Sequence, residues 1–260
     1  MNPFGGREAG EMPEQPQYPI DKAKRSIRVL NAVVERLLLE HPCRVVVDRD
    51  IQSARAMKPL AAFFVATNEN FDGVIRPLVG DVFVNLHAAL DAAIRAKVQE
   101  KGADITGVRF PVIDRPGDLD TAVRGASVHR AGPEVERFVR DLHAYPTGTG
   151  ENIWAACRLG VNLAHRQDVA FLTYMVTVRG IKSAAREAAV RDIVRQPARH
   201  GAKLVSPLPE EHYELGIDIK PDEVTVALSE GGPLETLPLL EVANNSSAAV
   251  SRVLDGIRDL

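Results

Sequence analysis

Residues 76–102 constrain the fold more than any other stretch, because they have the pattern of one long amphipathic helix. Pro77 suits a first helical turn, where backbone N–H groups have no partner within the helix, and Gly102 stands where a left-handed cap favours glycine. Apolar residues recur between them at three- and four-residue spacing: Val79, Val82, Phe83, Leu86, Ala89, Leu90, Ala93 and Ile94. This spacing places them on one broad face, so we predict that this helix is the buried spine of the fold.

The opposite side of the same helix carries Asp81 and Asn85, one turn apart, in a row that continues only with Ala88 and Ala92. Short side chains allow a second element to approach closely, so we predict that this side is covered as well. Two interpretations of the polar pair stay open. Asp81 and Asn85 either orient a binding or catalytic group on a facing helix, or satisfy helix ends and loops as buried polar residues.

Composition narrows the class of protein. The chain has 260 residues, 45% of them apolar, which is enough for a substantial core, and its net charge of −3 gives no bulk reason to bind nucleic acid. Cys43 and Cys157 form neither a CxxC pair nor a cluster with histidines, so we expect a reduced cytoplasmic protein without a metal site. We also predict no cofactor, because phosphate-loop, GxSxG and HExxH motifs are missing, and no membrane contact, because no apolar run approaches ~20 residues.

The remaining segments alternate between helical and strand patterns. Helices are predicted at residues 21–41, 118–124, 133–143, 151–166 and 182–195, and from residue 246 onward. Strands are predicted at residues 43–48, 60–67, 169–178, 215–219, 223–228 and 234–242. The implied fold class is α+β, with a helical bundle flanked by antiparallel strands.

The same patterns suggest a domain organisation. Residues 1–18 are polar and proline-rich, which predicts a disordered tail. We expect a helical core with a β-hairpin over 19–180 and a helix and linker over 181–210. The C-terminal strands and helix, 211–260, are expected to pack on that core as one domain.

The helix predicted at 151–166 carries a polar row of Glu151, Arg158, Asn162 and His165. Arg158 and His165 lie two turns apart on one face, with Asn162 between them. A histidine can act as general acid or base near pH 7, and an arginine can hold a phosphate and its developing charge. Arg158, Asn162 and His165 are therefore candidate catalytic residues for RNA cleavage if two copies meet in a dimer. The alternative is that the row is simply the solvated face of an amphipathic helix.

The 76–102 helix resembles that of a widespread, uncharacterised bacterial family, largely actinobacterial, whose helix reads roughly GD-x-x-x-NLRSALDH. The matching residues are Gly80, Asp81, Asn85, Leu86, Ala89, Leu90 and Asp91. The resemblance runs in order of elements from about residue 21 to the C-terminus and includes a later helix ending in His165-Arg166. It implies a fold like the HEPN helical domains, a superfamily that includes ribonucleases with an Arg-x4–6-His signature and many non-catalytic members.

This sequence departs from the family pattern where the signature would stand. His87 and Ala92 occupy the positions of the family's arginine and final histidine. We therefore keep two functional hypotheses: an RNA-binding or RNA-processing protein of a toxin–antitoxin or phage-defence locus, and a non-catalytic helical module for interaction or dimerisation. Candidate binding residues are Asp81, Asn85, His87 and Arg166, and the expected partners are a second copy, RNA or another protein. An ion pair between His87 and Asp91 is also expected, from their i, i+4 spacing.

Overall fold

The computed structural model describes residues 16–40, 43–51, 60–67, 71–165, 172–178, 193–198, 202–203, 208–209, 224–228, 232–234 and 237–260. Side-chain environments are described for residues 16–40, 74–164, 225–228, 233–234 and 237–260. Everything said below of the structure refers to these residues.

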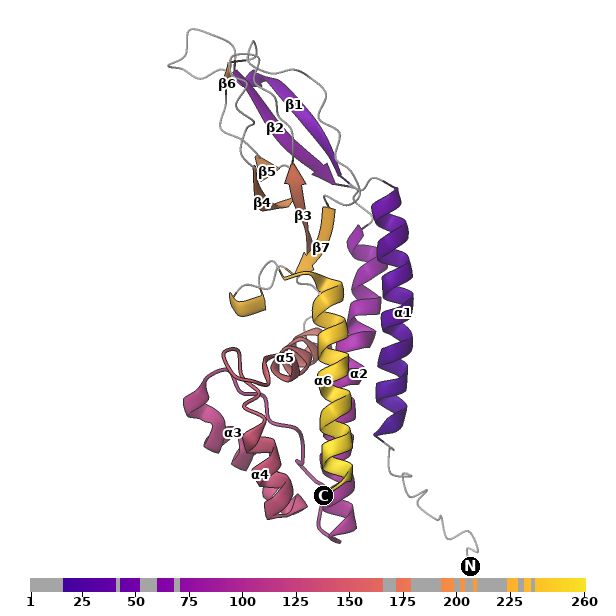
Figure 1. The fold of residues 1–260 in the computed structure, drawn as a ribbon, viewed down its shortest axis with the longest axis vertical. Helices are drawn as coiled ribbons and strands as arrows, with labels where there is room; N and C mark the ends of the chain where they lie inside the picture. Colours follow the sequence, from indigo (N-terminus) through magenta and orange to yellow (C-terminus); the bar gives the residue numbers. More distant parts are fainter. Residues whose placement is uncertain are drawn as a thin grey trace, which may run out of the picture. The chain divides into compact units, whose positions relative to one another are not determined.

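Helices form most of this part of the chain (Figure 1). They are α1 (Gln17–Leu39), α2 (Phe71–Glu100), α3 (Leu119–Gly125), α4 (Pro133–Asp141), α5 (Glu151–His165) and α6 (Leu239–Arg258). Short 3-10 turns lie at Pro116–Asp118, Val128–Ala131 and Gly232–Leu234.

The described strands fall into two groups by backbone pairing. β1 (Cys43–Ile51) pairs antiparallel with β2 (Leu60–Thr67), which also pairs with β5 (Ala202–Lys203) and β6 (Leu208–Pro209). In the other group, β3 (Leu172–Val178) lies between β4 (Ile193–Ala198) and β7 (Val224–Leu228), antiparallel to both. In register, Val45 faces Val65 and Tyr174 faces Val226.

The predicted α+β fold class is wrong, because the fold is mostly helical. Where side-chain environments are described, 75% of the residues are helical, and the single short strand there, β7, forms no sheet within that part. The fold class is therefore mostly helical, and the predicted layer of flanking antiparallel strands is not shown in that part.

The strands predicted at 43–48, 60–67, 169–178 and 223–228 coincide with β1, β2, β3 and β7, whereas the one predicted at 234–242 is wrong. Residues 234–242 were predicted as a strand, but α6 begins at Leu239, and Leu239, Val242, Ala243 and Ser246 are buried at helical spacing. A short apolar run fits either structure, and only its continuation to Arg258 reveals the helix. Ser246, predicted to cap the helix, lies within it. The end of the helix predicted at 182–195 belongs to β4, and the strand predicted at 215–219 lies outside the described residues.

The chain divides into two compact units. The first comprises Met1–Ile27, Gly80–Gln167 and Ala243–Leu260, and the second comprises Arg28–Val79 and Asp168–Val242. Every residue predicted to belong to a functional site lies in the first unit.

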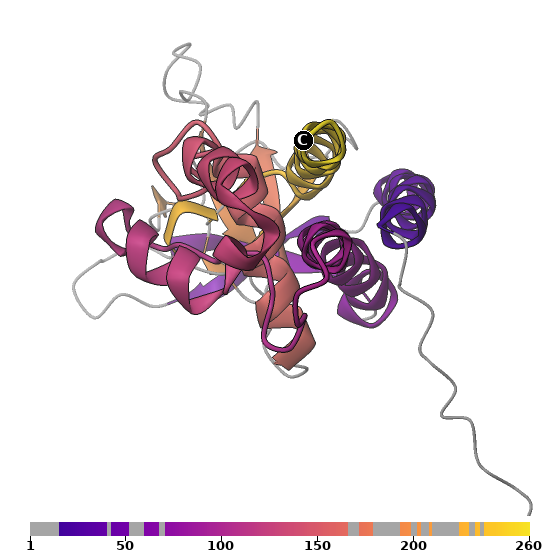
Figure 2. The ribbon, with the colours of Figure 1, turned by 90° about the horizontal axis from the view of Figure 1, so that it is seen from below.

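The core of the first unit confirms the prediction for the central helix. Phe83, Leu86, Leu90 and Ile94 of α2 have no exposed surface. From below, the ends of α1 and α6 lie beside α2 (Figure 2). α5 approaches α2 so closely that a Cβ at Gly160 would lie 2.7 Å from the carbonyl oxygen of Phe83. The apolar face is therefore buried because neighbouring helices cover it.

The predicted burial of the other face of α2 is only partly correct. Ala92 is buried with 5% exposure, and Ala88 is half-buried, but Asp81 is exposed. Covering elements therefore reach the C-terminal end of the row and not its beginning.

Residues Val74–Glu100 are long and apolar enough to cross a membrane by length and composition, although no continuous apolar run suggested it. Half of the most apolar window is buried inside the structure, and the core helix of a soluble protein meets the same criterion. The structure is thus compatible with a soluble protein.

Candidate functional site

Arg158 and Trp154 of α5 hold the carboxylate of Asp114, at the end of the loop formed by residues 103–115. Arg158 Nη1 donates to Asp114 Oδ2 across 3.3 Å, and Trp154 Nε1 donates to Asp114 Oδ1 across 3.2 Å. The indole is buried, whereas the side chains of Arg158 and Asp114 are 41% and 53% exposed. The two donors fasten the loop to α5.

The predicted catalytic row is therefore only partly visible. Asn162 is half-buried one turn beyond Arg158 and makes an interaction of its own. His165 ends α5, but its side chain lies outside the part of the chain whose side chains are described, and Arg166 is not described at all. The structure places the guanidinium of Arg158 beside a carboxylate, and the proposed partnership with His165 stays a prediction.

Asp81 and Asn85 make a local contact. The side-chain amide of Asn85 donates a hydrogen bond to the main-chain carbonyl of Asp81, one turn earlier in α2. This contact uses the amide within its own helix, and the carboxylate of Asp81 is exposed. No contact joins these two residues to Arg158, where the side chains of all three are described.

His87 lies beneath α5. A Cβ at Gly160 would come within 2.7 Å of His87 Cβ, so only glycine allows this approach. The His87 side chain is 17% exposed, and its Nε2 is buried without a hydrogen-bond partner among the described residues. The predicted contact with Asp91 is confirmed, at 3.8 Å between His87 Nε2 and Asp91 Oδ1, and it is an ion pair only when the imidazole is protonated.

Asp91 and Arg95 connect this position to the 103–115 loop. Asp91 Oδ1 accepts the backbone N–H of Phe110 across 2.7 Å, and Arg95 Nε donates to the carbonyl of Val108 across 2.9 Å. Arg95 Nη2 also lies 4.0 Å from Asp91 Oδ2. We call His87, Asp91 and Arg95 the His87 cluster. Sequence reasoning missed Arg95 and the loop, although the i, i+4, i+8 spacing of the three residues was a visible signal.

Burial sets the protonation states here. Desolvation lowers the pKa of His87 below its usual 6.5; the attraction of Asp91 opposes this shift, and the positive charges of Arg109 and Arg95 add to it. His87 is therefore a neutral imidazole at pH 7. Burial also raises the pKa of the Cys157 thiol, with a further contribution from Asp91. A thiol that stays protonated is a poor nucleophile, so Cys157 is not a candidate catalytic residue.

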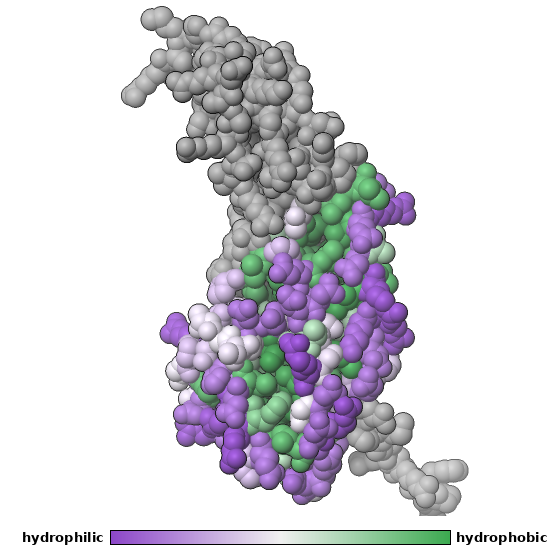
Figure 3. All heavy atoms as spheres, viewed as in Figure 1, coloured by the Kyte–Doolittle hydropathy of each residue, from purple (hydrophilic) through white to green (hydrophobic). Residues whose placement is uncertain are grey.

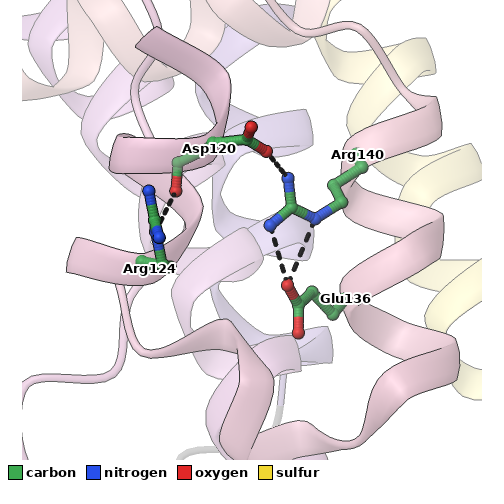
Figure 4. Close-up of polar contacts among 4 residues, drawn as sticks. All are labelled: Asp120, Arg124, Glu136 and Arg140. Atoms are coloured by element: carbon green, nitrogen blue, oxygen red, sulfur yellow. Dashed lines mark hydrogen bonds and ion pairs between the residues drawn. The ribbon is translucent and has the colours of Figure 1, made fainter.

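A further ionic cluster joins α3 to α4 (Figure 4). Arg140 pairs with Glu136, at 2.8 Å between Nη2 and Oε1, and with Asp120, while Arg124 Nε donates to the carbonyl of Asp120 across 3.2 Å. The hydrogen bonds that Arg140 donates to Glu136 and Asp120 raise its pKa. Asp120 is largely exposed, and such surface pairs each contribute only ~0–1 kcal/mol, so we assign this cluster a local structural role.

Pockets in the described part of the first unit include one of about 600 Å³ and one of about 340 Å³. The larger is bounded by the first turns of α1, the C-terminal end of α2 and the C-terminal end of α6, and we call it the three-helix groove. Its apolar lining residues are Ile20, Ala93, Ala96, Leu254 and Ile257, and its charged ones are Lys24, Lys97, Glu100, Asp255 and Arg258.

The smaller pocket, of about 340 Å³, is lined from α4, the start of α5 and α6, with Phe138, Leu142 and Val253 among its apolar residues. Apolar residues gather on this face between α4 and α6, flanked by polar ones (Figure 3). Neither of these two pockets includes Arg158, Asn162 or His87.

Comparisons of the chain with protein-family models, with curated proteins and with solved structures give no match. Among the described residues, no group of three or more histidine, cysteine or acidic side chains is placed to hold a metal ion. The function must therefore be argued from the geometry given above.

Proposed function

We propose that this chain is a non-catalytic helical module that binds a protein, either a second copy of itself or another chain, in the cytoplasm. The observation that carries this proposal is the contact of Arg158 with Asp114. Of the two hypotheses drawn from the sequence, RNA processing and non-catalytic interaction, this contact favours the second.

The argument rests on charge. A guanidinium stabilises a scissile phosphate through its positive charge and its N–H donors. Here the charged partner of Arg158 is a carboxylate, which offsets that charge and repels a phosphate approaching the same surface. Trp154 donates to the other oxygen of the same carboxylate, so Asp114 is held in place by two donors.

The central helix supports the same conclusion. The family resemblance would place an arginine and a histidine at positions 87 and 92, but here the first is an imidazole packed under α5 and the second is a buried alanine. Neither position offers a group to a substrate. A HEPN-like fold without catalytic residues fits the non-catalytic members of that superfamily.

The three-helix groove is the surface that we assign to the partner. Its apolar residues come from three helices and its margin carries charges of both signs, which is the composition of a protein interface with an apolar centre and a polar rim. Lys97 bonds Glu100 at 3.0 Å, and Arg258 pairs with Asp255, so the rim charges are already partly neutralised. Such a surface suits a protein better than a polyanion.

The catalytic hypothesis is tested by incubating total RNA and tRNA with the wild-type protein, Arg158→Ala and Asp114→Asn. We expect no cleavage by any of the three. RNA processing at this site would gain support if the wild type cleaved RNA, Arg158→Ala did not, and Asp114→Asn cleaved faster because its arginine is released.

The interaction hypothesis is tested by light scattering of the purified protein and by co-purification from cells. Ala96→Arg places a long cation in the three-helix groove and should weaken self-association or partner capture. Ala248→Arg is the matched control, because Ala248 is exposed on α6 and lines neither pocket. Equal behaviour of the two folded variants would exclude the groove as the interface.

A further inference from the structure

Three elements of the first unit meet at one buried imidazole. α2 contributes His87 itself, α5 covers it at Gly160, and the loop is bonded one turn away through Asp91 and Phe110. His87 has no role in the proposed binding of a partner protein. Its ring is titratable, and its buried nitrogen, Nε2, has no hydrogen-bond partner among the described residues.

A neutral imidazole is accommodated here, but an imidazolium is not. Once protonated, both ring nitrogens are donors and each requires an acceptor. The nearest carboxylate oxygen is Asp91 Oδ1 at 3.8 Å, and that atom already accepts the N–H of Phe110 at 2.7 Å. An imidazolium can bond this oxygen only if the carboxylate moves toward the ring, which lengthens its hydrogen bond to Phe110.

Neighbouring charges also act on the protonated form of His87. The charged groups that act on it are Asp91 and Arg95 from its own helix and Arg109 from the loop. On α5, the charge of Asp91 also raises the pKa of the Cys157 thiol. Two cations and one carboxylate thus surround a desolvated ring. An added positive charge is disfavoured unless Asp91 turns toward it.

We propose that His87 is an acid-sensitive latch: as a neutral ring it lets Asp91 hold the loop at Phe110, and on protonation it draws Asp91 away and loosens residues 108–110 from α2. Gly160 of α5 packs against the same histidine. Acid therefore loosens the loop from α2 while the helical core stays folded.

The lowered pKa of His87 determines how the stability of this region changes with pH. The pKa of His87 is lower in the folded protein than its ordinary 6.5, so the folded state binds fewer protons than the unfolded state. The stabilising contribution is fully present above pH 6.5 and is lost as the pH falls through the lowered folded value. The latch is closed at neutral pH and opens in acid.

The test is amide hydrogen exchange of the full chain near pH 7.5 and pH 5.5, expressed as protection so that the intrinsic pH dependence of exchange cancels. We expect the Phe110 amide of the wild type to lose protection several-fold at the lower pH, and His87→Gln to show no such loss. His129→Gln removes an exposed histidine and is the control, which should behave as the wild type does. Equal loss of protection in wild type and His87→Gln, or no loss in either, would overturn the proposal.

A second measurement covers the case in which His87→Gln fails to fold. In the wild type, the ring resonances of His87 and the amide resonance of Phe110 should titrate with one common midpoint. Separate midpoints, or a Phe110 amide that does not titrate, would show that the loop is not coupled to the imidazole.

Discussion

The close packing of Gly160 against α2 allows the stability lost on substitution at this position to be predicted. Gly160→Ala adds a Cβ that would lie 2.7 Å from the Phe83 carbonyl oxygen and 2.7 Å from His87 Cβ. Neither atom is the end of a flexible side chain, so α5 has to move away from α2. Overpacking of this kind typically costs ~1–3 kcal/mol.

The substitution also has a favourable part. Alanine is a better helix former than glycine by ~1 kcal/mol, so the net loss expected for Gly160→Ala is at most about 2 kcal/mol. Gly80→Ala isolates that favourable part, because Gly80 also lies within a helix, α2, and a Cβ there would meet nothing within 4 Å. We expect Gly80→Ala to stabilise the protein by ~1 kcal/mol.

The assay is urea denaturation of the wild type and both variants, followed by circular dichroism. The difference between the two variants measures the contact alone and should amount to ~1–3 kcal/mol. Midpoints that coincide for Gly160→Ala and Gly80→Ala would refute the close packing of α5 on α2, and with it the place assigned to His87.

Three further predictions concern the same helices. Leu90→Ala removes a fully buried side chain of α2 and should cost ~2–5 kcal/mol of a total stability of ~5–15 kcal/mol; a urea midpoint equal to that of wild type would contradict the role of α2 as spine. Ala92→Leu should cost ~1–3 kcal/mol in the same assay, because Ala92 is buried, and a neutral effect would mean that this end of the row is open. In a Cys43→Ser background, Cys157 should react with a thiol reagent only after denaturant is added, since its thiol is buried and its pKa raised; rapid reaction of the native protein would disprove this.

Elements with strong local periodicity were predictable from the sequence, and short runs were not. The apolar face of α2 repeats over several turns, so its burial was predictable, and the cap at Gly102 has the expected positive φ of 70°. The start of α2 was misplaced, because Pro77 was interpreted as a first helical residue whereas the helix begins at Phe71 and continues through the proline. Short runs such as 234–242 carry too few turns to separate strand from helix.

The site was harder to predict, for a different reason. Asp114 lies 40 residues before Trp154 and 44 before Arg158, and nothing in the local pattern indicates that these side chains meet. The polar row of α5 was visible, but its meaning depended on that distant carboxylate. By contrast, the pair of His87 and Asp91 lies on one helix, where spacing alone predicts contact.

The covering of α2 by α5 also has a consequence during synthesis. α2 ends at Glu100 and α5 begins at Glu151, so at ~5–20 residues per second the ribosome needs roughly 3–10 s to supply the helix that packs on Phe83 and His87. In that interval the nascent chain presents this part of α2 uncovered by α5, while the loop residues that bond Asp91 and Arg95 are already available. The loop can therefore bond to Asp91 and Arg95 before α5 has been synthesised. Slower translation of residues 101–150 lengthens the time for which this surface of α2 is accessible to other chains.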